Sequence, residues 1–162
     1  NKDILSYLNI IVMDYIYQLF MGNNTSTRKV NFEDVQHSMK NNSKFILINT
    51  LNSSRQDVLI KNTIPINKEE ELINTLIKSN QNVNIIVYDE NANAPNLMKK
   101  YDQLIGLGFM NVFIYPGGLF EWLLLQDIYG YENFPTTKQE TDIIKFKGKS
   151  IFNNYYLTND ID

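Results

Sequence analysis

Two apolar strands, joined by an amphipathic helix and followed by a Pro-Gly-Gly turn, constrain the fold of this chain most strongly. The strands are VNIIVY at 83–88 and NVFIY at 111–115, and the helix between them spans residues 96–107 and ends at Gly108. A short continuous apolar run predicts a buried strand, and strands that alternate with helices predict a parallel sheet. The sequence therefore predicts an α/β fold with a largely parallel sheet.

The same alternation extends toward the N-terminus. Asn31, with Asp34 at the N3 position, predicts the start of a helix that runs to about Lys40. The run FILIN at 45–49 predicts another buried strand, which a polar loop follows.

A second helix is expected between the first two strands. Residues 58–66 are expected to be extended, because Pro65 disfavours a helix there. Asn67 is expected to cap a helix over residues 68–79, whose early glutamates would face the positive end of the helix dipole.

The region after the Pro-Gly-Gly turn is expected to hold a helix over residues 119–128, with Trp122 in the core. The tyrosine-rich loop at 129–137 leaves two alternatives open, an exposed aromatic patch or packing over the last helix. A short strand is expected at 143–146, within a polar tail.

The composition excludes several classes of function. The chain has 162 residues, a net charge of −3, one histidine and no cysteine. No basic patch favours nucleic acid. The missing cysteine excludes disulfides, thiolate metal sites and thiol catalysis, and a zinc site or a Ser-His-Asp triad would depend on His37 alone. We therefore expect no metal and no cofactor.

The first 26 residues are expected to form an N-terminal extension. Apolar side chains from Ile4 to Phe20 follow helical spacing, which predicts an amphipathic helix docked on the domain or on a partner. The uninterrupted apolar run covers only residues 10–13, which is too short for a transmembrane span. Alternatively, residues 1–20 are upstream sequence, because residues 21–26 match the pattern for N-myristoylation at Gly22 if translation starts at Met21.

The central part of the chain resembles a rhodanese-like domain. The matching pieces are FILIN for the first core strand, VNIIVYDENANA for a strand and the active loop, and LIGLGFMNVFIYPGGLFEW for a helix, a strand and the Gly-Gly turn. The resemblance implies a rhodanese-like α/β/α sandwich with a mostly parallel central sheet over residues 27–137. A C-terminal tail of residues 138–162 would follow it.

The resemblance fails at the positions that carry the family's chemistry. Its active loop usually reads Cys-x-x-Gly-x-Arg, whereas this chain has Asp89, Glu90, Asn91, Ala92, Asn93 and Ala94. The Asp-x-Arg that usually follows the first core strand is Asn49-Thr50-Leu51 here. The usual Gly-His-Ile-Pro-Gly-Ala run is replaced by residues 61–66, KNTIPI. Asp89 thus stands in the position of the nucleophilic cysteine, and we expect its carboxylate to accept the amide N–H bonds of the loop.

The sequence thus leads to an expectation of a catalytically inactive rhodanese-homology domain that acts as a regulatory or protein-interaction module. Its partner is expected to be another protein and its location the cytoplasm, with a peripheral membrane contact if Gly22 is myristoylated. The alternatives are a sulfurtransferase-like or phosphatase-like enzyme with an unusual nucleophile, and a sensor that binds a small ligand in the residual loop pocket.

Overall fold

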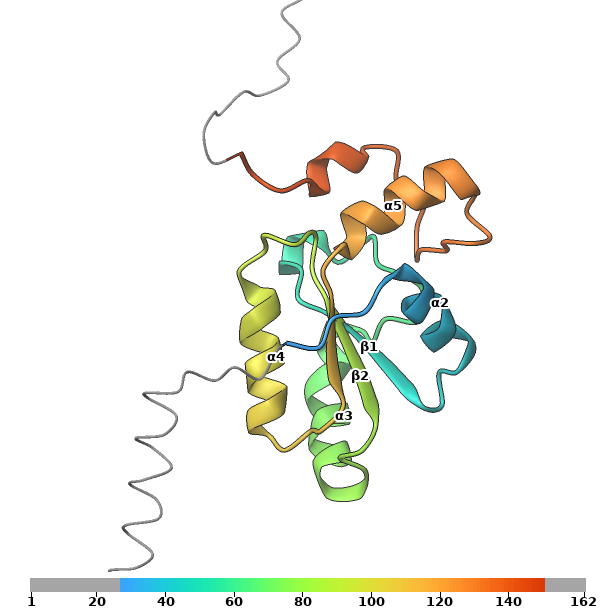
Figure 1. The fold of residues 1–162 in the computed structure, drawn as a ribbon. Coiled ribbons are helices and arrows are strands. Elements are labelled where there is room, and N and C mark those ends of the chain that lie inside the picture. The colour runs from blue at the N-terminus through green and yellow to red at the C-terminus, as the bar shows by residue number, and fades with distance from the viewer. Residues whose placement is uncertain (1–26, 151–162) are drawn as a thin grey trace, which may run out of the picture.

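The computed structural model describes residues 27–150, in which helices and strands alternate (Figure 1). The strands are β1 (Phe45–Asn49), β2 (Asn84–Tyr88) and β3 (Val112–Tyr115). The α-helices are α2 (Phe32–Lys40), α3 (Ile66–Ser79), α4 (Asn96–Gly106) and α5 (Gly118–Tyr129). Two 3₁₀ helices, η1 (Ser53–Arg55) and η2 (Ile143–Phe146), lie in the connecting segments.

The three strands form one parallel sheet in the order β1-β2-β3, which confirms the predicted α/β class. Right-handed crossovers between parallel neighbours place both connecting helices on the same side of a sheet. Accordingly, α3 and α4 cover one face, and α2 and α5 lie on the other (Figure 1). The outer edge of β3 pairs with the start of the described chain, where Lys29 bridges to Ile114.

Alternate residues of each strand point into two separate cores, one on each face of the sheet. Ile85 and Val87 of β2 pack with residues of α3 and α4, whereas Ile86 and Tyr88 pack with residues of α2 and α5. Trp122 of α5 is completely buried in the second core, as predicted.

The N-terminus of α2 is confirmed as predicted. The Asn31 side chain accepts a hydrogen bond from the Asp34 N–H at 3.1 Å, and the Asp34 carboxylate accepts one from the Asn31 N–H at 3.0 Å. This reciprocal capping box satisfies two backbone donors at the start of the helix.

Two of the predicted elements differ in the structure. α3 begins at Ile66 directly after Pro65, so Asn67 lies in its first turn and is not its cap. Proline already holds the φ angle of a helix start and needs no amide partner, which explains the earlier beginning. The strand expected at 143–146 is the 3₁₀ helix η2, because Phe146 turns into the core and no neighbouring strand is paired with this segment.

The tyrosine-rich loop combines both alternatives. Phe134 is buried and its ring lies 5.0 Å from the ring of Trp122, whereas Tyr129 is largely exposed. The loop therefore packs over α5 through Phe134 and leaves Tyr129 at the surface.

The expected N-terminal helix and Gly22 lie outside the described residues. Within residues 27–150, no helix combines the length and the apolar character needed to cross a membrane. The domain boundary at 137 stays a prediction, although Phe146, beyond it, belongs to the same core cluster as Trp122.

Candidate functional site

The predicted active loop lies at the carboxyl edge of the sheet, where ligands of α/β folds usually bind. It leaves β2 at Asp89 and returns into α4 at Asn96. The start of α5 is bonded to it, because the N–H groups of Leu119 and Phe120 donate to the carbonyl oxygens of Asp89 and Glu90, each at 2.9 Å. The ends of β2 and β3 therefore meet at this loop.

Gly118 makes this close approach possible. Its φ angle is +60°, and a Cβ atom at this position would lie 2.4 Å from the Asp89 carbonyl oxygen. A side chain there would collide with backbone, and L-residues disfavour this φ angle. The Pro-Gly-Gly turn is thus explained by the packing of α5 against the loop.

Asp89 is buried, with only 4% of its surface exposed. One carboxylate oxygen accepts a hydrogen bond from the Thr50 hydroxyl at 2.5 Å, and the other accepts the Glu90 N–H at 2.7 Å. Thr50 follows β1, so this bond ties the ends of two neighbouring strands together. Asp89 occupies the predicted position, but among the bonds described it accepts one backbone amide instead of a ring of them.

Asn91 holds the rest of the loop in shape. Its side-chain oxygen accepts the Asn93 N–H at 3.0 Å, and its carbonyl oxygen accepts the Ala94 N–H at 3.3 Å. Its side-chain amide donates to the carbonyl oxygen of Phe146 at 2.8 Å. The amide donors of Asn93 and Ala94 are therefore used within the loop itself.

Arg55 is a site residue that the sequence interpretation did not assign. Its guanidinium lies 3.4 Å from the Glu90 carboxylate and donates to the Lys145 carbonyl oxygen at 3.1 Å. It reaches the loop from η1, whereas the arginine usual in the family belongs to the loop itself. The available signal was that Arg55 is the only basic residue in the polar segment after β1.

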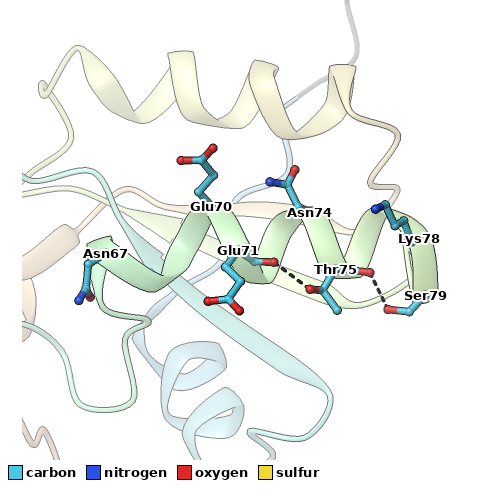
Figure 2. A pocket seen from close by; sticks show the side chains of 7 residues that line it. All are labelled: Asn67, Glu70, Glu71, Asn74, Thr75, Lys78 and Ser79. Atoms are coloured by element: carbon cyan, nitrogen blue, oxygen red, sulfur yellow. Dashed lines mark hydrogen bonds between the residues drawn. The ribbon is translucent and has the colours of Figure 1, made fainter.

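Two further hollows lie along α3, and the first of them also reaches Thr50, which bonds to Asp89, and Asn96, where the loop ends. A groove of about 790 Å³ runs between α3 and α4, and an ion pair of 2.7 Å between Lys100 and Glu69 spans the two helices there. A depression of about 660 Å³ follows the outer side of α3, and Figure 2 shows that all seven of its lining residues come from this one helix. Because no second element faces that depression, it offers a ligand one wall only.

The described residues contain no group of three or more histidine, aspartate or glutamate side chains that could hold a metal ion. At the loop, the charged residues Asp89, Glu90 and Arg55 contact one another or backbone groups. This arrangement holds the loop together through polar contacts within the protein.

Comparison with known proteins identifies the family. The rhodanese-like domain family matches residues 27–125, which is more than half of the chain. This chain belongs to the rhodanese-like family. A search of curated proteins found no match to this rhodanese-like chain.

Solved structures agree with this fold. The BH2092 protein from Bacillus halodurans is 20% identical, with 75% of this chain and 82% of that chain covered and a TM-score of 0.50. Ygr203w, a yeast protein tyrosine phosphatase of the rhodanese family, is 14% identical, with 69% and 92% covered and a TM-score of 0.50. A thiosulfate sulfurtransferase from Pseudomonas aeruginosa is 16% identical, with 60% of this chain and 19% of that one covered and a TM-score of 0.49. At such identities the likeness to the BH2092 protein and to Ygr203w shows the fold of this rhodanese-like domain and no activity.

Proposed function

We propose that this rhodanese-like domain is non-catalytic and acts as a protein-interaction module. The observation that carries the proposal is Asp89, a buried and hydrogen-bonded carboxylate at the position of the family's nucleophile, in a chain without cysteine. Without a thiolate there is no sulfur atom to form a persulfide or a thiophosphate. The Asp89 carboxylate is held by Thr50 and is not presented to a substrate.

The charges around the loop also disfavour an anionic substrate. Asp89 and Glu90 add negative charge where thiosulfate or a phosphate ester would dock. Arg55, the nearby cation, already lies beside Glu90 and donates to a backbone carbonyl. An arriving anion would have to displace these contacts before it gained a charge-assisted bond.

The surface of α5 supports a role in protein binding. Leu124 is 41% exposed and Ile128 is 69% exposed, and residues four apart lie side by side on a helix. Tyr129 is 59% exposed at the end of the same helix. Exposed apolar residues that lie together are typical of protein interfaces, in which tyrosine is enriched. We name Leu124, Ile128 and Tyr129 the α5 surface.

A quantitative pull-down from lysate of the source cell tests this proposal. The baits are the wild type, a Leu124→Ser/Ile128→Ser variant of the α5 surface, and Asp127→Ala as a matched control on the same helix. We expect one or more proteins to be recovered with the wild type and the control, and their recovery to fall by about tenfold or more with the surface variant. Tenfold corresponds to about 1.4 kcal/mol of binding free energy.

A fourth bait, with Asp89, Asn91 and Asn93 changed to alanine, tests the loop as the alternative recognition surface. A partner lost only with this bait would move the interface from α5 to the loop. If the wild type recovers nothing specific, the proposal of an interaction module is contradicted.

We also propose that the protein works in the cytoplasm, with a peripheral membrane contact if Gly22 is myristoylated. This proposal derives from the sequence pattern alone. Mass spectrometry of the native protein tests it, because a mature chain that starts at Gly22 with a 14-carbon acyl group would support it. An unmodified chain that contains residues 1–21 would contradict it.

A further inference from the structure

The segment that contains η2 lies against the relic active loop. Two consecutive backbone carbonyl groups of this segment accept hydrogen bonds from side chains around the loop. The Lys145 oxygen accepts from Arg55 at 3.1 Å, and the Phe146 oxygen accepts from Asn91 at 2.8 Å. Both are bonds between positions more than 50 residues apart in the sequence, so they fix tertiary structure.

Phe146 anchors this segment. It is 1% exposed and packs in the core that contains Trp122. The Arg55 guanidinium lies 5.5 Å from the centre of the Phe146 ring, and the Lys145 ammonium lies 5.0 Å from it. The face of an aromatic ring attracts a cation that lies within about 6 Å of the ring centre. The ring and the carbonyl group of Phe146 are therefore both held beside the loop.

The contact continues past the anchor. A Cβ atom at Gly148 would lie 2.9 Å from the side-chain nitrogen of Asn93, which places this backbone directly on the loop. Lys145 also forms an ion pair with Glu140, which precedes it in the same stretch of chain. The segment therefore contacts Arg55 and the loop at residues 145 and 146, and the loop again at Gly148.

We propose that residues 142–148 form a strap that occupies the relic loop as an internal ligand. Its two carbonyl oxygens take the donors, Arg55 and Asn91, with which the loop would otherwise bind an oxygen-rich group from outside. The inference goes beyond the proposed function, because it holds whichever surface a partner uses. A partner that binds the loop must displace the strap. Its apparent affinity is then the intrinsic affinity multiplied by the fraction of molecules in which the strap is released.

Hydrogen exchange of the full chain with the variant Asn91→Asp tests the strap. This change keeps the side-chain oxygen that accepts the Asn93 N–H and replaces the donor to Phe146 with an oxygen, which repels the carbonyl. We expect exchange to become at least about tenfold faster in peptides covering 89–95 and 142–150, with β1 and α4 unchanged. The matched control is Asn96→Asp, which makes the same charge change outside the strap contacts.

The proposal is overturned if the two peptides exchange as in the wild type, or if the control changes them equally. A second variant tests the strap independently if Asn91→Asp loosens the whole fold. Asn93→Cys combined with Gly148→Cys introduces the only two thiols into a chain without cysteine. Mild oxidation is expected to join them within one chain and to slow exchange in both peptides relative to the reduced form of the same protein. No disulfide, or equal exchange in both forms, would overturn the strap.

Discussion

At the scale of single residues, the buried polar side chains within residues 27–150 separate into those with hydrogen-bond partners and one without. Tyr88 is buried, and its hydroxyl group accepts the Ile60 N–H at 3.1 Å and bonds to Thr63 at 2.9 Å. The Tyr115 hydroxyl group is buried without a hydrogen-bond partner. Since an unsatisfied buried polar group is unfavourable whereas a satisfied one is nearly neutral or stabilising, these similar side chains contribute differently to stability.

Removing the Asp89 carboxylate is expected to destabilise the fold. In Asp89→Ala the Glu90 N–H loses its side-chain acceptor, and the Thr50 hydroxyl keeps only the Tyr88 carbonyl oxygen at 3.4 Å. We expect the free energy of unfolding to fall by about 1–3 kcal/mol, measured by urea denaturation. Asp102→Ala, an exposed position on α4, should change it by less than about 0.5 kcal/mol. Equal stabilities of the two variants would contradict a structural role for Asp89.

The two buried tyrosines are expected to respond in opposite directions to loss of the hydroxyl group. Tyr88→Phe leaves the Ile60 N–H unsatisfied, so it should lower the free energy of unfolding by about 1–3 kcal/mol. Tyr115→Phe removes a group that has no partner, so it should be neutral or stabilising by up to about 1 kcal/mol. Urea denaturation at pH 7 compares the two, and a loss in Tyr115→Phe would show that its hydroxyl group does have a partner in solution.

The same tyrosines make stability dependent on alkaline pH. Burial raises the pKa of both phenols above the ordinary value of 10.0, and the charge of Glu121 raises the pKa of Tyr115 further, although the two groups form no hydrogen bond of ordinary geometry. Above pH 10 the unfolded chain releases these protons while the folded chain keeps them, so stability is lost as the pH rises. Tyr115→Phe should lose less stability than the wild type between pH 10 and 11, and parallel losses would contradict the raised pKa.

At the scale of elements, the turn from β3 into α5 determines how closely α5 packs against the loop. The φ angle of Gly118 and its contact with the Asp89 backbone leave no room for a side chain. The Pro-Gly-Gly run predicted a turn. The sequence did not reveal that glycine is required at position 118, because the backbone that it contacts, at Asp89, follows another strand, β2.

Gly118→Ala is therefore expected to destabilise the protein by about 2–5 kcal/mol. About 1–2 kcal/mol derives from the left-handed backbone conformation and about 1–3 kcal/mol from the steric overlap. Gly106→Ala in α4, with no atom within 4 Å of its new methyl group, should be neutral or slightly stabilising. Thermal denaturation of both variants checks this, and a tolerated Gly118→Ala would contradict the close approach of α5.

Sequence reasoning found the elements whose signals are local. The apolar runs of β1, β2 and β3 and the Asn31 capping box were all predicted, because each signal lies within a few residues. The start of α3 and the nature of η2 were predicted wrongly. The first is decided by Pro65, and the second by contacts of Phe146 with residues far away in the sequence, which periodicity does not reveal.

At the scale of the whole molecule, the loop, η1 and the strap (residues 142–148) are one packed unit. Arg55 and Asn91 both bond to residues beyond position 140. The sequence predicted the loop and its missing cysteine, but not this assembly, because three segments distant in the chain contribute to it.

Phe146 gives the most direct test of this unit. Phe146→Ala removes a buried ring and is expected to lower the free energy of unfolding by about 3–5 kcal/mol. Ile144→Ala, at a side chain that is 50% exposed, should lower it by less than about 1 kcal/mol. If Phe146→Ala is as mild as its control, the folded domain ends near residue 137 as the sequence suggested.

The proposed absence of catalysis depends on the buried Asp89 carboxylate, which stands in the place of the family's cysteine. The most direct measurement is thiocyanate formation from thiosulfate and cyanide by the purified wild type and by Asp89→Ala. We predict that neither forms thiocyanate faster than buffer alone, because no side chain at the loop can carry a sulfur atom. Turnover by the wild type that is lost in Asp89→Ala would contradict the account.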